Sequence, residues 1–302
     1  MANGKAAAIG IDLGGNNIKG VLLDQAGKIL LEDTHPTGDI FQDGPWQQSV
    51  KKFYENLYDK AGATNLPVGL SAPGLNNMDH SAILCMPGRF FGLEGLNWSK
   101  YLNANVKVLN DAHAATMAES KLGAGKGVDN LVLLTLGTGV GGGIVIGGKL
   151  YQGFFQMAGH LGHIAVNGYA EERSIAGMPG SLEDAIGDIS VKRRSLGKFQ
   201  NTAELVAAFE QGDTWAVYLW LDSVRKLALG ICSIANGISP ESIILGGGIS
   251  KAGKSLFVPL QDFLDLYEWR PAGKRTTVVP AHFLEYAGAA GAAVFALEQE
   301  DL

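Results

Sequence analysis

The chain has 302 residues, of which 46% are hydrophobic and 18% are charged, a balance typical of globular rather than disordered proteins. Its net charge of -6 argues against nucleic acid or an anionic membrane as a general partner. Two cysteines, Cys85 and Cys232, are too few for a disulfide framework or a four-thiolate metal site. The sequence shows no signal-peptide pattern and no apolar run of the roughly 20 residues that a membrane span needs, so we expect a cytoplasmic protein with no membrane partner.

The first part of the chain predicts a small sheet with a helix beside it. Strand-like segments over 6–13, 18–23 and 28–32 are joined by glycine turns, which indicates consecutive hairpins. Apolar residues at near-helical spacing predict a helix over 46–62. Short strands follow at 67–71 and 107–109, and the residues after Asn110-Asp111 are predicted to be helical as far as 121.

The second part repeats this alternation. A buried strand over 131–136 enters a glycine turn and returns over 144–146, and the span 182–237 is mostly helical. Two further strands and an alanine-rich helix are predicted at 242–245, 276–279 and 288–298. Strands and helices that alternate twice over indicate an α/β protein with two lobes that meet near residue 111.

Glycine makes up 42 of the residues, about twice its usual share, and the excess falls in turns that follow strands. The turns after Asp12 and after Leu136 expose backbone N–H groups of the kind that hold phosphate oxygens. Asp12 is also a candidate to hold Mg²⁺ through water. The structural alternative is a pair of hairpin turns, the first with an aspartate that caps it.

Two other features allow a structural and a functional interpretation. Asn110 and Asp111 lie at the carboxyl end of a strand, where ligands bind in α/β sheets, although both residue types also cap helices well. The glycines at 246–248 follow a buried strand, and glycines there allow a flat ring such as a nucleotide base to lie on the backbone. The P-loop and dinucleotide-binding fingerprints are both missing from the sequence.

Taken together, the order and spacing of these features resemble the superfamily of sugar kinases, Hsp70 and actin. Within it the chain is similar to the ROK family (repressors, open reading frames and sugar kinases) over essentially its whole length, most specifically at 10–15, 110–115, 137–143 and 158–163. This resemblance implies the two-lobed, actin-like and ribonuclease H-like ATPase fold. The small α/β lobe would contain 1–111 and 288–302, the large α/β lobe would contain 112–287, and the active site would lie in the cleft between them.

The resemblance also implies an ATP-dependent sugar kinase that phosphorylates the 6-hydroxyl of a hexose or N-acetylhexosamine, with Asp111 as the base and Mg²⁺ near Asp12. The residues implied to bind the sugar are Gly74, Asn110, His160, His163 and Glu183. The residues implied to bind the nucleotide are Asp12, Gly14, Gly15, Asn16, Asn17, Gly137, Thr138, Gly139, Gly246, Gly247 and Gly248. Of these, the last three would lie against the adenosine. The partners are thus a sugar and a nucleotide, and the family's frequent homodimer is expected here.

Three positions depart from the family pattern. The family's zinc-binding cysteines are replaced in the stretch Ser174–Ser181, so no zinc is expected, and His163 should form hydrogen bonds instead of binding metal. His160 replaces a glutamate of the glucose-specific members, which favours N-acetylhexosamines because a ring N–H can donate to an acetamido oxygen. Arg89 follows Pro87-Gly88, where the family has a sugar-side asparagine, and the sequence does not decide whether it faces the site or solvent.

Two other functions remain to be weighed. The family includes transcriptional repressors, but those carry an N-terminal helix-turn-helix of roughly 80 residues, whereas the first glycine-turn strand here begins by residue 6. A non-catalytic sugar-binding protein with a decayed site is the stronger alternative, although Asp111 is intact. The sequence also leaves open whether ATP or polyphosphate is the phosphoryl donor.

Overall fold

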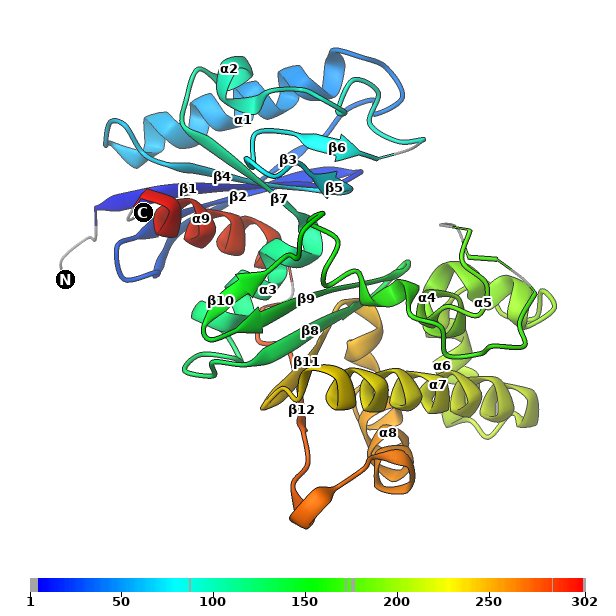
Figure 1. Cartoon of the computed structure of the whole chain (residues 1–302). Helices are drawn as coiled ribbons and strands as arrows, with labels where there is room; N and C mark the ends of the chain where they lie inside the picture. The colour runs from blue at the N-terminus through cyan, green and yellow to red at the C-terminus, as the bar shows by residue number, and fades with distance from the viewer. Residues whose placement is uncertain (1–4, 87, 172, 175–176, 284, 301–302) are drawn as a thin grey trace. The chain divides into compact units, whose positions relative to one another are not determined.

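The computed structural model describes residues 5–300 except 87, 172, 175–176 and 284 (Figure 1). The chain forms two compact units. The first unit contains 1–127, 150–158 and 283–302, and the second contains 128–149 and 159–282. Residues 112–127, 150–158 and 283–287, which were expected in the second lobe, belong to the first of these units.

The first unit is built on a five-stranded sheet of order β3-β2-β1-β4-β7. Its strands are β1 (Ala6–Leu13), β2 (Asn17–Asp24), β3 (Ile29–Pro36), β4 (Val68–Ala72) and β7 (Val106–Asn110). The first three strands are antiparallel hairpin partners, as expected, whereas β4 and β7 run parallel to β1. The first unit also contains a two-stranded sheet of β5 (Leu75–Asn76) and β6 (Ile83–Cys85).

Helices cover both faces of this sheet. They are α1 (Pro45–Ala61), α2 (Trp98–Leu102), α3 (Asp111–Lys121) and α9 (Ala287–Glu300). One hydrophobic cluster joins the sheet to buried residues of α1 and α2, including Trp46 and Trp98. A second cluster joins the other face to α3 and α9, and Figure 1 shows α1 and α9 on opposite sides of the sheet.

Close backbone packing holds α9 between the sheet and α3. A Cβ on Gly10 would overlap the carbonyl of Ala289, and a Cβ on Gly69 would overlap that of Ala292. On the other side of the helix, a Cβ on Gly291 would overlap the carbonyl of Ala114 in α3. Because α3 packs so closely on α9, the helix that begins at Asp111 lies in the same unit as the N-terminal sheet.

The second unit contains a sheet of order β10-β9-β8-β11-β12. Its strands are β8 (Leu131–Leu136), β9 (Val140–Ile146), β10 (Lys149–Tyr151, of which Lys149 belongs to this unit), β11 (Ser242–Gly246) and β12 (Thr277–Pro280). β9 is antiparallel to β8, whereas β11 is parallel to both β8 and β12. Each unit thus combines an antiparallel hairpin with parallel strands that follow later in the chain.

The long helical span expected at 182–237 divides at capping residues. It forms α4 (Leu182–Ile186), α5 (Asp188–Arg194), α6 (Thr202–Glu210) and α7 (Thr214–Ile238). Side chains of Ser181, Asn201 and Asp213 accept hydrogen bonds at the starts of α4, α6 and α7. The unit is completed by α8 (Lys254–Tyr267) and the short 3₁₀ helices η1 (Leu161–His163), η2 (Gly248–Ala252) and η3 (Pro271–Gly273).

The predicted α/β class is confirmed by this arrangement of strands and helices. Among the described residues, the structure contains no helix with the length and apolar character needed to span a membrane.

The close approach of α9 to the sheet makes a direct stability prediction. We expect Gly69→Ala to lower the free energy of unfolding by at least about 2 kcal/mol, because the new methyl group has no space and backbone atoms must move. Gly237→Ala is the control, since a Cβ at that position meets nothing within 4 Å. Thermal and urea denaturation would measure the stability of both variants. If Gly69→Ala were as stable as Gly237→Ala, the contact between α9 and the sheet would accommodate the added methyl group, against the prediction.

Candidate functional site

A glycine turn joins β1 to β2 in the first unit and presents residues 14–17. The turn closes with a hydrogen bond from the Gly14 N–H to the Asn17 carbonyl at 3.1 Å. Thr37 holds it from behind, since its Oγ1 donates to the Gly14 carbonyl at 2.7 Å. A Cβ on Gly14 would lie 2.6 Å from the Asn17 carbonyl oxygen, so a side chain there would disturb the closed turn. Asn16 and Asn17 are exposed at its outer side.

The carboxylate of Asp12 lies just before this turn and is largely covered by protein. Ser71, at the carboxyl end of the neighbouring strand β4, donates its hydroxyl to Asp12 Oδ1 at 2.6 Å. Burial raises the pKa of Asp12 to about 6, with a further increase from the charge of Asp111, against the opposing effects of the Ser71 hydrogen bond and Lys19. Gly288 of α9 makes room for this carboxylate, because a Cβ there would lie 2.5 Å from Asp12 Cγ.

Asn110 takes the capping role that the sequence left open between Asn110 and Asp111. Asn110 is the helix cap, and its Oδ1 accepts hydrogen bonds from the backbone N–H groups of Ala112 and His113. Its Nδ2 donates to the carbonyl of Gly74, a residue in the left-handed conformation with φ of 100°. The Asp111 side chain accepts a hydrogen bond from the Ala112 N–H and remains accessible at its surface.

The environment of Asp111 suits a group that exchanges a proton. The side chain is accessible to solvent, but the protein around it displaces part of its hydrating water. This partial desolvation disfavours the charged form and raises the pKa of Asp111 above the usual value. Hydrogen bonds from Ala112 and Asn110 and the charge of Arg89 act in the opposite direction. The first unit therefore brings two carboxylates, Asp12 and Asp111, close enough for the charge of one to disfavour the charge of the other.

In the second unit, the start of α5 holds the glycine turn at 137–139. The backbone N–H groups of Asp188 and Ile189 donate to the carbonyls of Gly137 and Thr138. Glu183 of α4 accepts a hydrogen bond from the Val140 N–H at 3.2 Å, and its carboxylate occupies the space that a Cβ on Gly139 would need. The turn therefore carries an acidic side chain on one flank, and Thr138 is exposed.

The third glycine turn lies at the end of β11. Gly247 has a φ of 83°, and a Cβ there would overlap the backbone of Leu136 at the end of β8. Gly248 begins η2, and a Cβ on it would meet no atom within 4 Å. The parallel strands β8 and β11 thus bring the two glycine turns of the second unit to one edge of the sheet, with the surface of Gly248 open.

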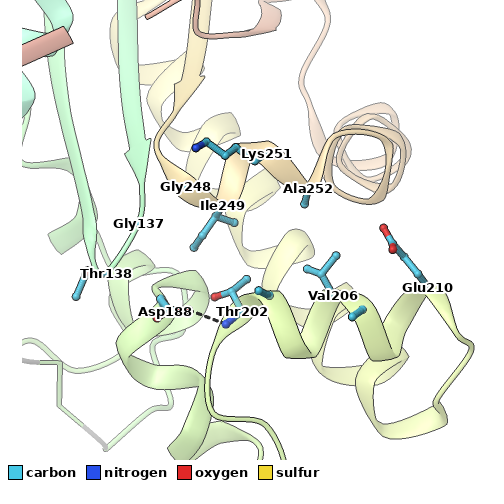
Figure 2. A pocket seen from close by; sticks show the side chains of 12 residues that line it. Gly137, Thr138, Asp188, Thr202, Val206, Glu210, Gly248, Ile249, Lys251 and Ala252 are labelled. Carbon is cyan, nitrogen blue, oxygen red and sulfur yellow. Dashed lines mark hydrogen bonds between the residues drawn. The ribbon is translucent and has the colours of Figure 1, made fainter. Parts of the chain in front are cut away.

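A pocket of about 500 Å³ lies where these turns meet α6 (Figure 2). It is lined by Gly137, Thr138, Asp188, Thr202, Ala203, Val206, Ala207, Glu210, Gly248, Ile249, Lys251 and Ala252. Three of the residues expected to bind nucleotide, Gly137, Thr138 and Gly248, share this pocket, whereas Gly139, Gly246 and Gly247 are outside its described lining. Sequence reasoning missed the contribution of α6, because its residues form no motif and reach the pocket only through packing.

Thr202 is a notable member of the lining. The residue is 6% exposed, and Oγ1 has no hydrogen-bond partner among the described residues. Its backbone N–H is bonded to Asp188 Oδ1 at 2.6 Å, so the helix start is fixed while the hydroxyl is unused. A buried hydroxyl without a partner is unfavourable, and a ligand in the pocket would relieve that cost.

Two of the sequence-predicted sugar residues lie together in the second unit, His163 at the end of η1 and His160 directly before its start. The rings of His160 and His163 are nearly parallel, with centroids 6.3 Å apart. Burial, and then the charge of His163, lower the pKa of His160, so its ring is neutral near pH 7. Gly162 packs against the Val140 carbonyl, so η1 and Glu183 both contact the start of β9.

The segment 174–181, in which the resemblance implied lost zinc ligands, is held by hydrogen bonds in its described part. Ser181 caps α4, and the N–H groups of Val166 and Asn167 donate to the Gly180 carbonyl. Ile175 and Ala176 lie outside the described residues, as does Pro87. Within the described part of the chain, no group of three or more metal-ligating side chains is found. The expected lack of zinc stays a prediction that metal analysis of the purified protein would test.

The raised pKa of Asp12 predicts a pH-dependent stability. Between about pH 4 and 6 the unfolded chain releases this proton before the folded protein does, so the wild type loses stability as the pH rises through that range. We therefore expect Asp12→Asn to raise the free energy of unfolding by about 1 to 3 kcal/mol at pH 7.5. This gain in the free energy of unfolding should disappear below pH 4. Denaturation at pH 7.5 and below pH 4 would test the prediction, with the exposed Asp59→Asn as the control. A destabilised Asp12→Asn protein at pH 7.5 would contradict it.

Comparisons with known proteins agree with the geometry. The model of the ROK family matches residues 8–299. A glucokinase of Halalkalibacterium halodurans is 30% identical over 86% of this chain and 85% of its own length. The structure of a ROK hexokinase from Thermus thermophilus is 28% identical with a TM-score of 0.87, covering 98% of this chain and 99% of that one. A ROK family glucokinase from Streptomyces griseus, solved with glucose and AMPPNP, is 26% identical with a TM-score of 0.76 over 96% and 99% of the two chains. The resemblance of the sequence and the actin-like ATPase fold that it implied are thereby confirmed, and the chain belongs to the ROK family.

Proposed function

We propose that the protein is an ATP-dependent carbohydrate kinase that transfers the γ-phosphoryl group of ATP to the 6-hydroxyl of a hexose or an N-acetylhexosamine. The observation that carries this proposal is the division of roles between Asn110 and Asp111. Asn110 satisfies the start of α3, so the neighbouring carboxylate is not needed as its cap and is left accessible near Asp12. A helix start that needed only a cap would not require this second acidic group.

The pocket of the second unit suits the nucleotide. Its volume of about 500 Å³ is within the range of small-molecule sites, and its lining combines apolar side chains with a few polar groups. The uncovered glycines at 137 and 248 allow phosphate and base to approach the backbone, and Thr202 offers an unused hydroxyl. ATP as the donor is further supported by the AMPPNP complex of the Streptomyces griseus relative.

Asp111 acts on the sugar, which is the acceptor of the phosphoryl group. In the proposed step, O6 of the sugar forms a bond to Pγ, the bond from Pγ to the bridging oxygen breaks, and ADP leaves with that electron pair. Asp111 accepts the proton of the 6-hydroxyl. Because the phosphoryl-transfer transition state is loose, this proton is lost late, and the position of the carboxylate matters more than its basicity.

The carboxylates of the first unit also fit a hydrated magnesium ion. Asp12 has Ser71 on one oxygen and feels the negative charge of Asp111, and a divalent cation would relieve this repulsion. We assign Asp12 as the residue that holds Mg²⁺ through water, near phosphates that rest on the turn at 14–17. When bound, the ion would neutralise charge that develops on the phosphate oxygens.

The sugar is selected in this proposal by His160 and Glu183, with His163, Asn110 and Gly74 as further contacts. A neutral His160 donates one hydrogen bond and accepts one, which suits an acetamido group. His163 has a buried Nδ1 with no hydrogen-bond partner in the described part of the chain, and it is a second candidate to contact the sugar. Glucose remains in the substrate class because the Streptomyces griseus relative was solved with it.

Asp111 belongs to the first unit and the pocket to the second. In this proposal both act on the same pair of substrates. Closure of two lobes around that pair and assembly as a homodimer stay predictions from the sequence.

The first test is the activity of Asp111→Asn. A coupled assay of ADP release would cover glucose, mannose, fructose, N-acetylglucosamine and N-acetylmannosamine with ATP and Mg²⁺. We expect the wild type to phosphorylate at least one sugar and the variant to lose about 10²- to 10⁴-fold in kcat, because the proton of the 6-hydroxyl has no acceptor. The exposed control Asp79→Asn should keep full activity. Sugar binding without turnover in the wild type would instead support the non-catalytic alternative.

The second test concerns the nucleotide pocket. Thr202→Val removes a hydroxyl that has no described partner, so the stability of the free protein should be unchanged or slightly raised. If that hydroxyl bonds the nucleotide, the KM for ATP should rise about 3- to 10-fold while the KM for the sugar stays constant. Thr214→Val, at the exposed start of α7, is the matched control. An unchanged KM for ATP would remove Thr202 from the nucleotide site.

A further inference from the structure

Arg89 is a charged residue of the first unit that the proposed mechanism does not yet use. Its loop follows β6, and the side chain reaches the glycine turn between β1 and β2. The Nη2 atom lies 2.8 Å from the position that a Cβ on Gly15 would take, so any larger residue at 15 would displace the guanidinium. The positive charge of Arg89 also acts on Asp111 and favours its ionised form. The guanidinium is therefore near both the turn assigned to phosphate and the carboxylate assigned to the sugar hydroxyl.

The loop that carries Arg89 is firmly anchored. The next residue, Phe90, is 2% exposed, and its ring packs edge-on against Trp46 with centroids 5.4 Å apart. Trp46 Nε1 donates to the carbonyl of Phe91 at 2.9 Å, and the Phe91 N–H donates to Ile40. These contacts fix the backbone immediately after Arg89, so the long side chain starts from a defined position.

The backbone at Phe90 is also strained. Its φ of 55° is in the left-handed region, which is rare for a bulky aromatic residue and costs on the order of 1 kcal/mol or more. Gly88, on the other side of Arg89, has a φ of 78°. Strained conformations of this kind persist where the surrounding structure imposes them, and they are concentrated at ligand sites. The strained residue here directly follows Arg89, whose guanidinium lies against Gly15.

The guanidinium has unused hydrogen-bonding capacity. Within the described part of the chain, Arg89 forms no ion pair with a carboxylate within 4 Å, although Asp12 and Asp111 belong to the same unit. A guanidinium has five N–H donors in a planar fork that matches two oxygens of a phosphoryl group. Lys19, the other cation near Asp12, already donates to the carbonyl of Glu285 at 3.1 Å.

We propose that Arg89 binds the oxygens of the phosphoryl group while it passes from ATP to the sugar. This inference rests on the proposed kinase function. In the step given above, negative charge spreads over the three non-bridging oxygens of that group, and a guanidinium over Gly15 would stabilise this charge more in the transition state than in the bound substrates. The proton still passes to Asp111 and the electron pair to ADP, so Arg89 exchanges no atoms.

The competing explanation is that Arg89 recognises a carboxylate of an acidic sugar. The two explanations differ in the kinetic constant that they affect. A residue that binds the moving phosphoryl group lowers kcat when it is removed, whereas one that binds a sugar carboxylate raises the KM for the sugar. The experiment therefore compares Arg89→Gln and Arg89→Lys with the wild type, and uses the exposed Arg275→Gln as a control.

We expect Arg89→Gln to lower kcat by about 10²- to 10³-fold with less than a 3-fold change in the KM for sugar. Arg89→Lys should recover part of the loss, because it keeps the charge but not the planar fork. In Arg89→Gln, the affinity for ADP with aluminium fluoride in the presence of the sugar should fall by about the same factor as kcat. The affinity for ADP alone should not change. A merely structural role of Arg89 would not separate these two affinities.

Three results would overturn the inference: an unchanged kcat in Arg89→Gln, a defect confined to the KM for sugar, or equal weakening of ADP and ADP–aluminium fluoride. Thermal melting of each variant would verify folding, and because Arg89 is exposed, no large change is expected. If the wild type transfers phosphate to none of the sugars, the proposed function fails and the inference fails with it. If the wild type is active and Arg89→Gln is equally active, only the inference about Arg89 fails and the proposed function stands.

Discussion

The site of the first unit depends on how closely α9 packs between the sheet and α3. Glycine at 10, 69 and 291 lets backbone atoms meet where any side chain would overlap a carbonyl. This contact brings Gly288 against Asp12 and fixes α3, which begins at Asp111. The two carboxylates thus hold their positions because three glycines far apart in the sequence permit one close helix contact. The helix itself is rich in alanine for the same reason, since most of its surface faces protein.

Electrostatics then gives the site its chemical character. Two carboxylates with raised pKa values disfavour each other's charge, and folding keeps them together at the expense of stability. Such an arrangement is characteristic of functional sites, where charge is held ready for a ligand that compensates it. Lys19 and Arg89 supply the opposing positive charge. Of the two, only Lys19 has a described hydrogen bond, which it donates to the Glu285 carbonyl. In the second unit the pocket instead combines glycines that no other atom covers with one buried hydroxyl that has no described hydrogen-bond partner.

Much of this could be predicted along the chain. The three N-terminal hairpin strands, the glycine turns at strand ends and the pair Asn110-Asp111 were all evident in the sequence, because each depends on residues that are close in sequence. The pairing of hairpin strands follows from turn chemistry, and a carboxylate at a strand end is a local signal. The assignment of α3 to the first unit was not evident, because it depends on the contact between Gly291 and Ala114.

The sequence by itself determined the class of the fold, the family and the positions of the glycine turns and of Asp111, since glycine and aspartate at those points carry local physical requirements. Only the tertiary structure decided that Ser71 and Gly288 enclose Asp12, that Thr202 of α6 completes a pocket, and that Arg89 lies over Gly15. The physical reason is that these residues come from strands, helices and loops whose proximity arises through packing. A single serine, threonine or arginine has no sequence signal of its own until burial and neighbouring charges give it a role.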